Sequence, residues 1–232
     1  MLLFSSPFIG GLLALSISSA KTNFLKLFLS FSAAFLFSVS ITSLLPEIIH
    51  SGNEFTGVFV LLGFFLQIVI ENFSKGAEHG HLHIEKDHPN GAGTSVLIAL
   101  CLHSFFEGIP LGAGVFDKAT FLPFLLGISL HELPASFTLL ALFKAYKKPN
   151  SFLWVALIIY SSMAPIGAFA GKIFSDNIIN PTYVNYLLAL IVGTFLHIST
   201  VILFESSNKH VFARSKWIAI LIGSAFGVLS IF

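Results

Sequence analysis

Eight apolar segments, separated by short polar stretches, fill this chain of 232 residues. A helix that crosses a bilayer needs about 20 mostly apolar residues, because lipid offers no partner for backbone polar groups. The segments are approximately 2–19, 27–49, 56–73, 95–115, 121–143, 152–173, 183–205 and 217–232. The sequence therefore predicts an all-α integral membrane protein with eight transmembrane helices, and one membrane domain over residues 1–232.

Charged residues make up only 10% of the chain, whereas soluble domains carry roughly 25%. Such a chain could not cover a water-facing surface, so the composition excludes a soluble enzyme and a nucleic-acid binder. We expect membrane lipid as a partner. The one cysteine, Cys101, excludes an intramolecular disulfide framework.

The first and last segments have special features. Ser18-Ser19-Ala20 follows the first apolar run in the manner of a signal-peptide cleavage site. No basic residue precedes that run and it contains Pro7, so we favour a first spanning helix. The last segment has only about 16 residues, and we expect it to be short or partly interfacial.

Lysine and arginine predict the orientation. If successive loops alternate between the two sides of the membrane, 10 of the 12 basic residues lie on one side and only Lys118 and Lys172 on the other. The basic side is cytoplasmic by the positive-inside rule. Both termini are then extracytoplasmic, in the plasma membrane or a bacterial inner membrane.

Ionisable groups at the middle of the fourth and fifth segments are the strongest candidates for function. A charged group at the bilayer centre costs about 2.5–3.5 kcal/mol on insertion scales. His103 and Glu107 are four residues apart and share a helix face. His131 and Glu132 lie at the same depth in the next helix. Imidazole and carboxylate suit zinc, iron, manganese, cobalt or nickel, so these four residues predict a metal site.

Prolines lie close to this level. Pro110 and Pro134 are within a turn of the candidate ligands, and Pro165 marks a similar depth in the sixth segment. Proline removes a helix hydrogen bond, and transporters commonly build ion sites at interrupted helices. We therefore expect interruptions at these positions, and a break at Pro46 near the outer end of the second segment.

Further candidate metal-binding residues lie at other depths of the predicted membrane spans. Glu47 and His50, at the outer end of the second segment, could capture a metal ion, and His197 and Glu205, below the middle of the seventh, could release it. A role in helix ends or helix packing stays open for each. We interpret Glu71, at the inner end of the third segment, as an interfacial charge.

The predicted cytoplasmic loop 76–93, between the third and fourth segments, is rich in histidine. His79, His81, His83 and His88 alternate with acidic residues in a composition typical of metal binding. We expect a flexible loop that binds metal weakly, with a merely solvated loop as the alternative.

The segments and motifs together resemble the ZIP (zinc/iron-regulated-transporter-like) family of divalent metal transporters. The family shows His-Asn-x-x-Glu-Gly in its fourth span, and residues 103–108 read His-Ser-Phe-Phe-Glu-Gly. Residues 131–136 read His-Glu-Leu-Pro-Ala-Ser, similar to the family's His-Glu-x-Pro-x-Glu or Gln-Asp-x-Pro-Glu. Leu-Pro-Glu at 45–47 and Ala-Pro-Ile-Gly at 164–167 resemble two further motifs. The resemblance implies eight spans, both ends outside and a histidine-rich loop.

The resemblance also implies a transport site on His103, Glu107 and His131. Ala135 stands where one family pattern has a metal-binding glutamate, and Ala164 where members with a second metal have one. A single site, with Glu132 as fourth ligand or close neighbour, therefore fits better than a two-metal centre.

The implied function is import of a divalent metal, zinc first, by alternating access, with the metal as cargo and no cofactor. A homodimer stays open. One alternative is an intramembrane metalloenzyme, although the His-Glu-x-x-His motif that begins at His131 lacks its second histidine at Ala135. The other is a membrane metal receptor that works through the loop histidines.

Overall fold

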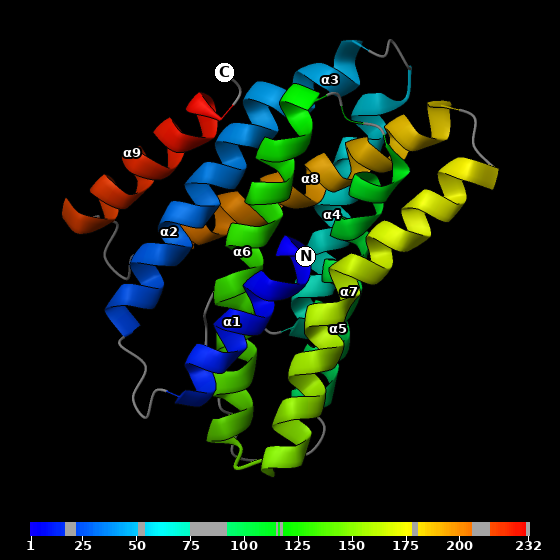
Figure 1. Ribbon diagram of the computed structural model, residues 1–232. Helices are drawn as coiled ribbons and strands as arrows, with labels where there is room; N and C mark the ends of the chain where they lie inside the picture. Colours follow the sequence, from blue (N-terminus) through cyan, green and yellow to red (C-terminus); the bar gives the residue numbers. More distant parts are fainter. Residues whose placement is uncertain are drawn as a thin grey trace.

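The computed structural model describes residues 1–16, 22–50, 54–74, 92–114, 116, 118–177, 181–205 and 214–230. Within these ranges the chain forms helices and no strand (Figure 1). They are α1 (Leu2–Ser16), α2 (Thr22–Val39), the π-helical turn η1 (Ser40–Leu44), α3 (Leu45–His50), α4 (Thr56–Ser74), α5 (Ala92–Ala113), α6 (Lys118–Ala145), α7 (Asn150–Asn177), α8 (Pro181–Glu205) and α9 (Arg214–Leu229). The all-helical prediction is confirmed for the described residues.

Six helical segments of the described chain are long and apolar enough to cross a membrane: the α2–η1–α3 rod, α4, α5, α6, α7 and α8. The helices α1 and α9 have 15 and 16 residues, fewer than the roughly 20 that a full crossing needs. Six of the eight predicted spans are therefore long helices, and the expectation of a short last segment is met by α9; the short helices α1 and α9 pack against α6 and α2, respectively.

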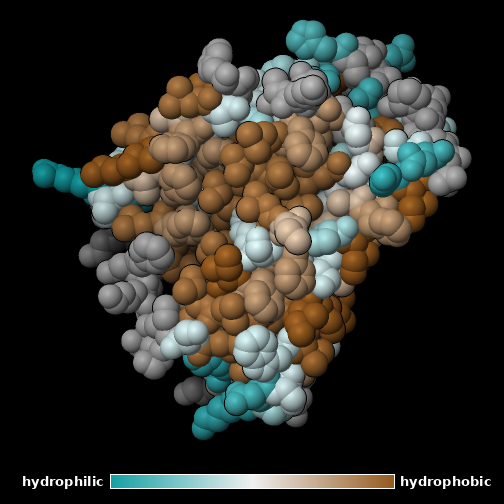
Figure 2. Space-filling model, in the orientation of Figure 1, coloured by the Kyte–Doolittle hydropathy of each residue, from teal (hydrophilic) through white to brown (hydrophobic). Residues whose placement is uncertain are grey.

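Apolar side chains cover the middle of the molecular surface. In Figure 2 they form a broad area, while hydrophilic side chains gather towards its lower end and upper right. Exposed apolar side chains also lie on α4, where Leu61 and Phe65 are each 59% exposed. An exposed apolar surface of this extent suits lipid rather than water as the solvent.

Proline alters the helical hydrogen bonding of the α2–η1–α3 rod more than that of the other long helices. A π-helical turn, in which the N–H of Leu45 binds the carbonyl oxygen of Ser40, precedes Pro46. The wider turn accommodates a residue that lacks an N–H and crowds the preceding turn. By contrast, Pro110, Pro134 and Pro165 lie inside continuous helices, so the expected interruptions at those positions are not found.

Glycine allows α5 and α7 to touch backbone to backbone. A Cβ atom at Gly108 of α5 would overlap the carbonyl oxygen of Ala164, and one at Gly167 of α7 would overlap that of Phe105. Small residues at helix contacts bring helices together where lipid supplies no hydrophobic driving force. Together with α1 and α6, these two helices enclose a hydrophobic cluster that includes Leu100, Leu139 and Tyr160. We call α1, α5, α6 and α7 the first helix group.

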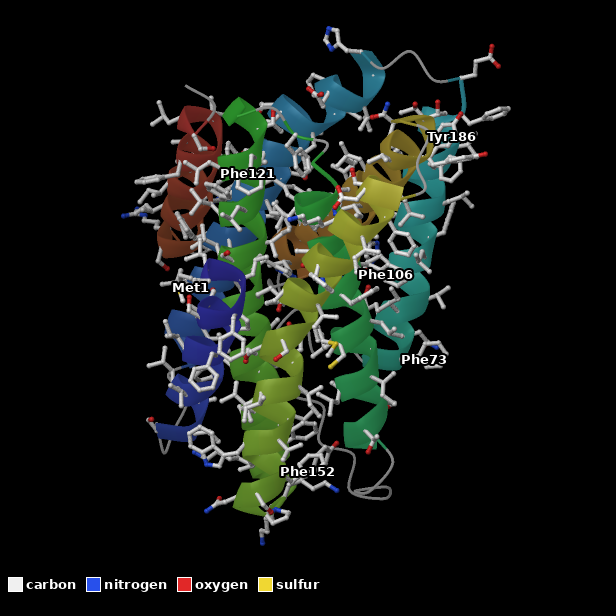
Figure 3. The ribbon with its side chains drawn as sticks, turned by 45° about the vertical axis from the view of Figure 1, so that its right-hand side comes forward. Met1, Phe73, Phe106, Phe121, Phe152 and Tyr186 are labelled. Atoms are coloured by element: carbon white, nitrogen blue, oxygen red, sulfur yellow. The ribbon has the colours of Figure 1, made fainter. Side chains whose placement is uncertain are left out.

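The helices α4 and α8 are joined in the same way. A Cβ atom at Gly63 would overlap the carbonyl oxygen of Leu190, and one at Gly193 would overlap that of Val60. Closer to the N-terminal ends of both helices, the rings of Phe59 and Tyr186 stack with centroids 4.4 Å apart; Figure 3 labels Tyr186 at this end of α8, beside α4. The rod α2–η1–α3 packs against α8, and α9 packs against α2. We call α2–η1–α3, α4, α8 and α9 the second helix group.

Candidate metal centre

Three of the four strongest candidates from the sequence come together where α5 meets α6. The ligand atoms of His103, Glu107 and His131 all lie within 4.8 Å of one another. Nε2 of His103 is 2.8 Å from Oε1 of Glu107, and the rings of the two histidines meet edge to face at 5.8 Å between centroids. Among the described residues, no other trio of histidine, cysteine or acidic side chains comes this close. We call these three residues the three-donor cluster.

The chemistry of the three-donor cluster fits a divalent metal. All three side chains are at most 2% exposed, so a bound ion would be stripped of most of its water. Donor atoms around tetrahedral zinc lie about 3.3 Å apart, given bonds of about 2.0 Å. Separations near 4.8 Å would therefore have to shorten by up to about 1.5 Å and the 2.8 Å contact between His103 and Glu107 would have to widen slightly, changes that side-chain rotations can supply. Two imidazoles and one carboxylate leave one coordination position of a tetrahedral ion open.

Glu132 does not join these donors, although it follows His131 in the sequence. Its carboxylate is buried and lies near the hydroxyl groups of Tyr160 on α7 and Ser104 on α5. The reason is helical geometry, since adjacent residues point about 100° apart and Glu132 faces α7 when His131 faces His103. Of the two roles expected for Glu132, its position matches that of a neighbour rather than a fourth ligand.

The sequence analysis missed two polar side chains on the second helix group. Gln67 of α4 is fully buried and Thr194 of α8 is 6% exposed, and both line a small cavity together with His103 and Glu107. A polar residue in the middle of the apolar segment 56–73 was the available signal for Gln67. Nothing in the sequence indicated that α4 lies against α5.

His197 pairs with Glu71, which lies on α4. Nε2 of His197 is 2.6 Å from Oε2 of Glu71, and the imidazole meets the ring of Phe64 edge to face at 4.9 Å. We expected Glu71 to be only an interfacial charge, but its carboxylate also contacts a histidine on another helix. Glu205 ends α8, and its side chain lies outside the described residues.

Glu47 and His50 lie on the short helix α3, one turn beyond the π-helical turn. His50 is exposed and its Nδ1 contacts the carbonyl oxygen of Pro46 at 2.7 Å, while Glu47 is partly exposed. Neither belongs to a group of three metal-type ligands among the described residues. The loop candidates His79, His81, His83 and His88 lie outside the described residues.

The fold and the three-donor cluster define an integral membrane protein with metal-type ligands buried between its helices. A comparison with protein families matches residues 90–231 to the family described as ZIP Zinc transporter, and the chain belongs to that family. The match begins just before α5 and includes all three donors. Family membership points to a transporter rather than an enzyme.

A curated relative supports the same assignment. Protein zntD of Dictyostelium discoideum is 27% identical to this chain over 148 residues. The matched stretch covers 59% of this chain and 22% of the relative, so the chain spans about a fifth of the length of that protein.

Proposed function

We propose that this protein moves a divalent metal ion, zinc first, across the membrane into the cytoplasm. The observation that carries the proposal is the three-donor cluster, because buried imidazole and carboxylate groups at this spacing serve a cation better than they serve packing. Ionisable groups at this depth would cost several kcal/mol without such a role. Membership of the ZIP family supports a metal as the cargo.

The proposed route runs through the bundle in three stages. The ion is captured near Glu47 and His50, at the outer end of the α2–η1–α3 rod. It exchanges its water for His103, Glu107 and His131. It then leaves past the His197–Glu71 pair towards the histidine-rich loop 76–93. The excess of basic residues in the cytoplasmic loops supports this orientation, with both termini outside.

The way the helices are joined supports a mechanism of alternating access. The glycine contacts hold α5 against α7 and α4 against α8, and the three donors belong to α5 and α6 of the first helix group. Rocking of the first group against the second would expose the donors to one side of the membrane at a time. The metal would keep its three ligands while its other surroundings change.

Metal-resolved uptake tests the proposal. Wild-type protein in proteoliposomes should accumulate zinc in a saturable way, and parallel assays with iron, manganese and cadmium should establish the preference. The double variant His103→Ala plus Glu107→Ala should reduce flux to the level of empty liposomes. Saturable accumulation that survives this double substitution would sink the proposed site, and wild-type binding without any accumulation would favour a receptor.

A further inference from the structure

A small cavity lies on one side of the three-donor cluster, between the two helix groups. His103 and Glu107 line it from the first group, and Gln67 and Thr194 line it from the second. Apolar side chains complete the wall: Leu66, Ile70, Phe106, Leu190 and Ile191. The volume open to a water-sized sphere is about 10 Å³, which is what one water molecule requires. Figure 3 labels Phe106 on α5 on the side where α4 runs alongside.

Gln67 and Thr194 supply neutral oxygen donors to this cavity. The hydroxyl of Thr194 donates its proton to the carbonyl oxygen of Ile191 at 2.8 Å, so its lone pairs remain to accept a hydrogen bond. The carboxamide of Gln67, which is fully buried, offers both an acceptor and donors. Both residues could hold one water molecule without adding charge.

The three donors leave one position of a tetrahedral ion unfilled, and Glu132 faces another helix. We propose that Gln67 and Thr194 hold, in this cavity, the water molecule that fills the fourth coordination position of the metal. This proposal rests on the proposed function, and it makes both residues positioning residues that act on the metal through water.

The water contact depends on how the two helix groups sit relative to one another. Gln67 and Thr194 are fixed to each other because Gly63 and Gly193 bring α4 and α8 into backbone contact. The metal ligands belong to α5 and α6. Rocking of the first group would carry the ion away from Gln67 and Thr194, so these residues strengthen metal binding in this conformation alone.

Cobalt(II) binding to the purified protein tests the proposal, because the visible absorption of cobalt reports the geometry and number of its ligands. Partners of metal ligands typically contribute 10–100-fold to affinity, so Gln67→Met should weaken cobalt binding about tenfold and change the absorption bands. Thr194→Val, which keeps the shape of the side chain, should weaken binding about threefold. Ile191→Val alters an apolar wall of the same cavity and should change neither.

The outcomes separate this proposal from the proposed function. A folded Gln67→Met protein with wild-type cobalt affinity and spectrum would overturn the role of Gln67, whereas wild-type protein that neither binds nor transports metal would overturn the proposed function itself. A role in helix packing alone would lower the thermal stability of the metal-free protein and leave the cobalt spectrum unchanged. If Gln67→Met does not fold, Gln67→Asn and Thr194→Val decide by the same measurements.

Discussion

Two histidine–carboxylate contacts lie within the described part of the chain, and they differ in donor number and in exposure. The three-donor cluster combines His103, Glu107 and His131, all nearly inaccessible to solvent. The His197–Glu71 pair has two donors, and the side chain of Glu71 is 24% exposed. A third donor and the exclusion of water favour retention of an ion, whereas two donors and partial hydration favour its passage. The difference supports the proposed route, in which the first contact binds the ion and the second lets it leave.

The largest expected effect comes from removing one donor of the three-donor cluster. His131→Ala should weaken metal binding about 100-fold or more, since even partners that only support a ligand contribute 10–100-fold. Isothermal titration of the purified protein with zinc measures this. Glu132→Gln is the matched control one residue away and should weaken binding much less, because Glu132 lies outside the cluster. Equal losses in the two variants would show that the cluster has a fourth protein ligand.

A smaller effect of a different kind is expected at the His197–Glu71 pair. Glu71→Gln should lower the maximum transport rate about fivefold, as expected from about 1 kcal/mol, and leave KM close to its wild-type value. His197→Ala should behave similarly. Initial rates of zinc uptake over a range of zinc concentrations separate the two parameters. A change in KM as large as that of His131→Ala would mean that the pair also retains the ion.

Acid should weaken uptake through both contacts. Metal binds neutral imidazole and ionised carboxylate, and protons compete for the same atoms. Lowering the external pH from about 7.5 to about 5.5 brackets the ordinary pKa of histidine and should reduce zinc uptake several-fold. Uptake that rises under acid would show that a proton gradient drives transport strongly enough to outweigh this competition.

The smallest effect is expected at the outer end of the molecule. Glu47→Gln combined with His50→Ala should raise the KM for zinc by less than about threefold, since both side chains are at least partly exposed and hold no third ligand. Their contribution is electrostatic attraction, so it should disappear at high salt. A tenfold change that persists at high salt would place a true binding site at the outer end.

The sequence predicted the positions of the helices well, but it did not predict which helices lie next to one another. Apolar length and polar separators located all the helices to within a few residues, and the four-residue spacing of His103 and Glu107 predicted a shared face. Contacts between helices follow from packing, which periodicity does not encode. Gln67, Thr194 and Glu71 face other helices only because Gly63 and Gly193 allow α4 and α8 to touch, and the contact with α5 follows from that pair. The sequence left open whether Glu132 is a fourth ligand or a close neighbour for the same reason, since its neighbour Tyr160 is on α7.

The backbone contacts made by glycine also bear on how the chain assembles during synthesis. The closest helix pairs join segments that are not consecutive: α5 with α7, α4 with α8, α1 with α6 and α2 with α9. Since domains form as the ribosome delivers the chain, α4 must remain in the bilayer without its partner until about a hundred further residues have been made. During that interval the amide of Gln67 lacks its neighbours on α8. Early termination or a slow ribosome should therefore leave α4 as a target for membrane quality control.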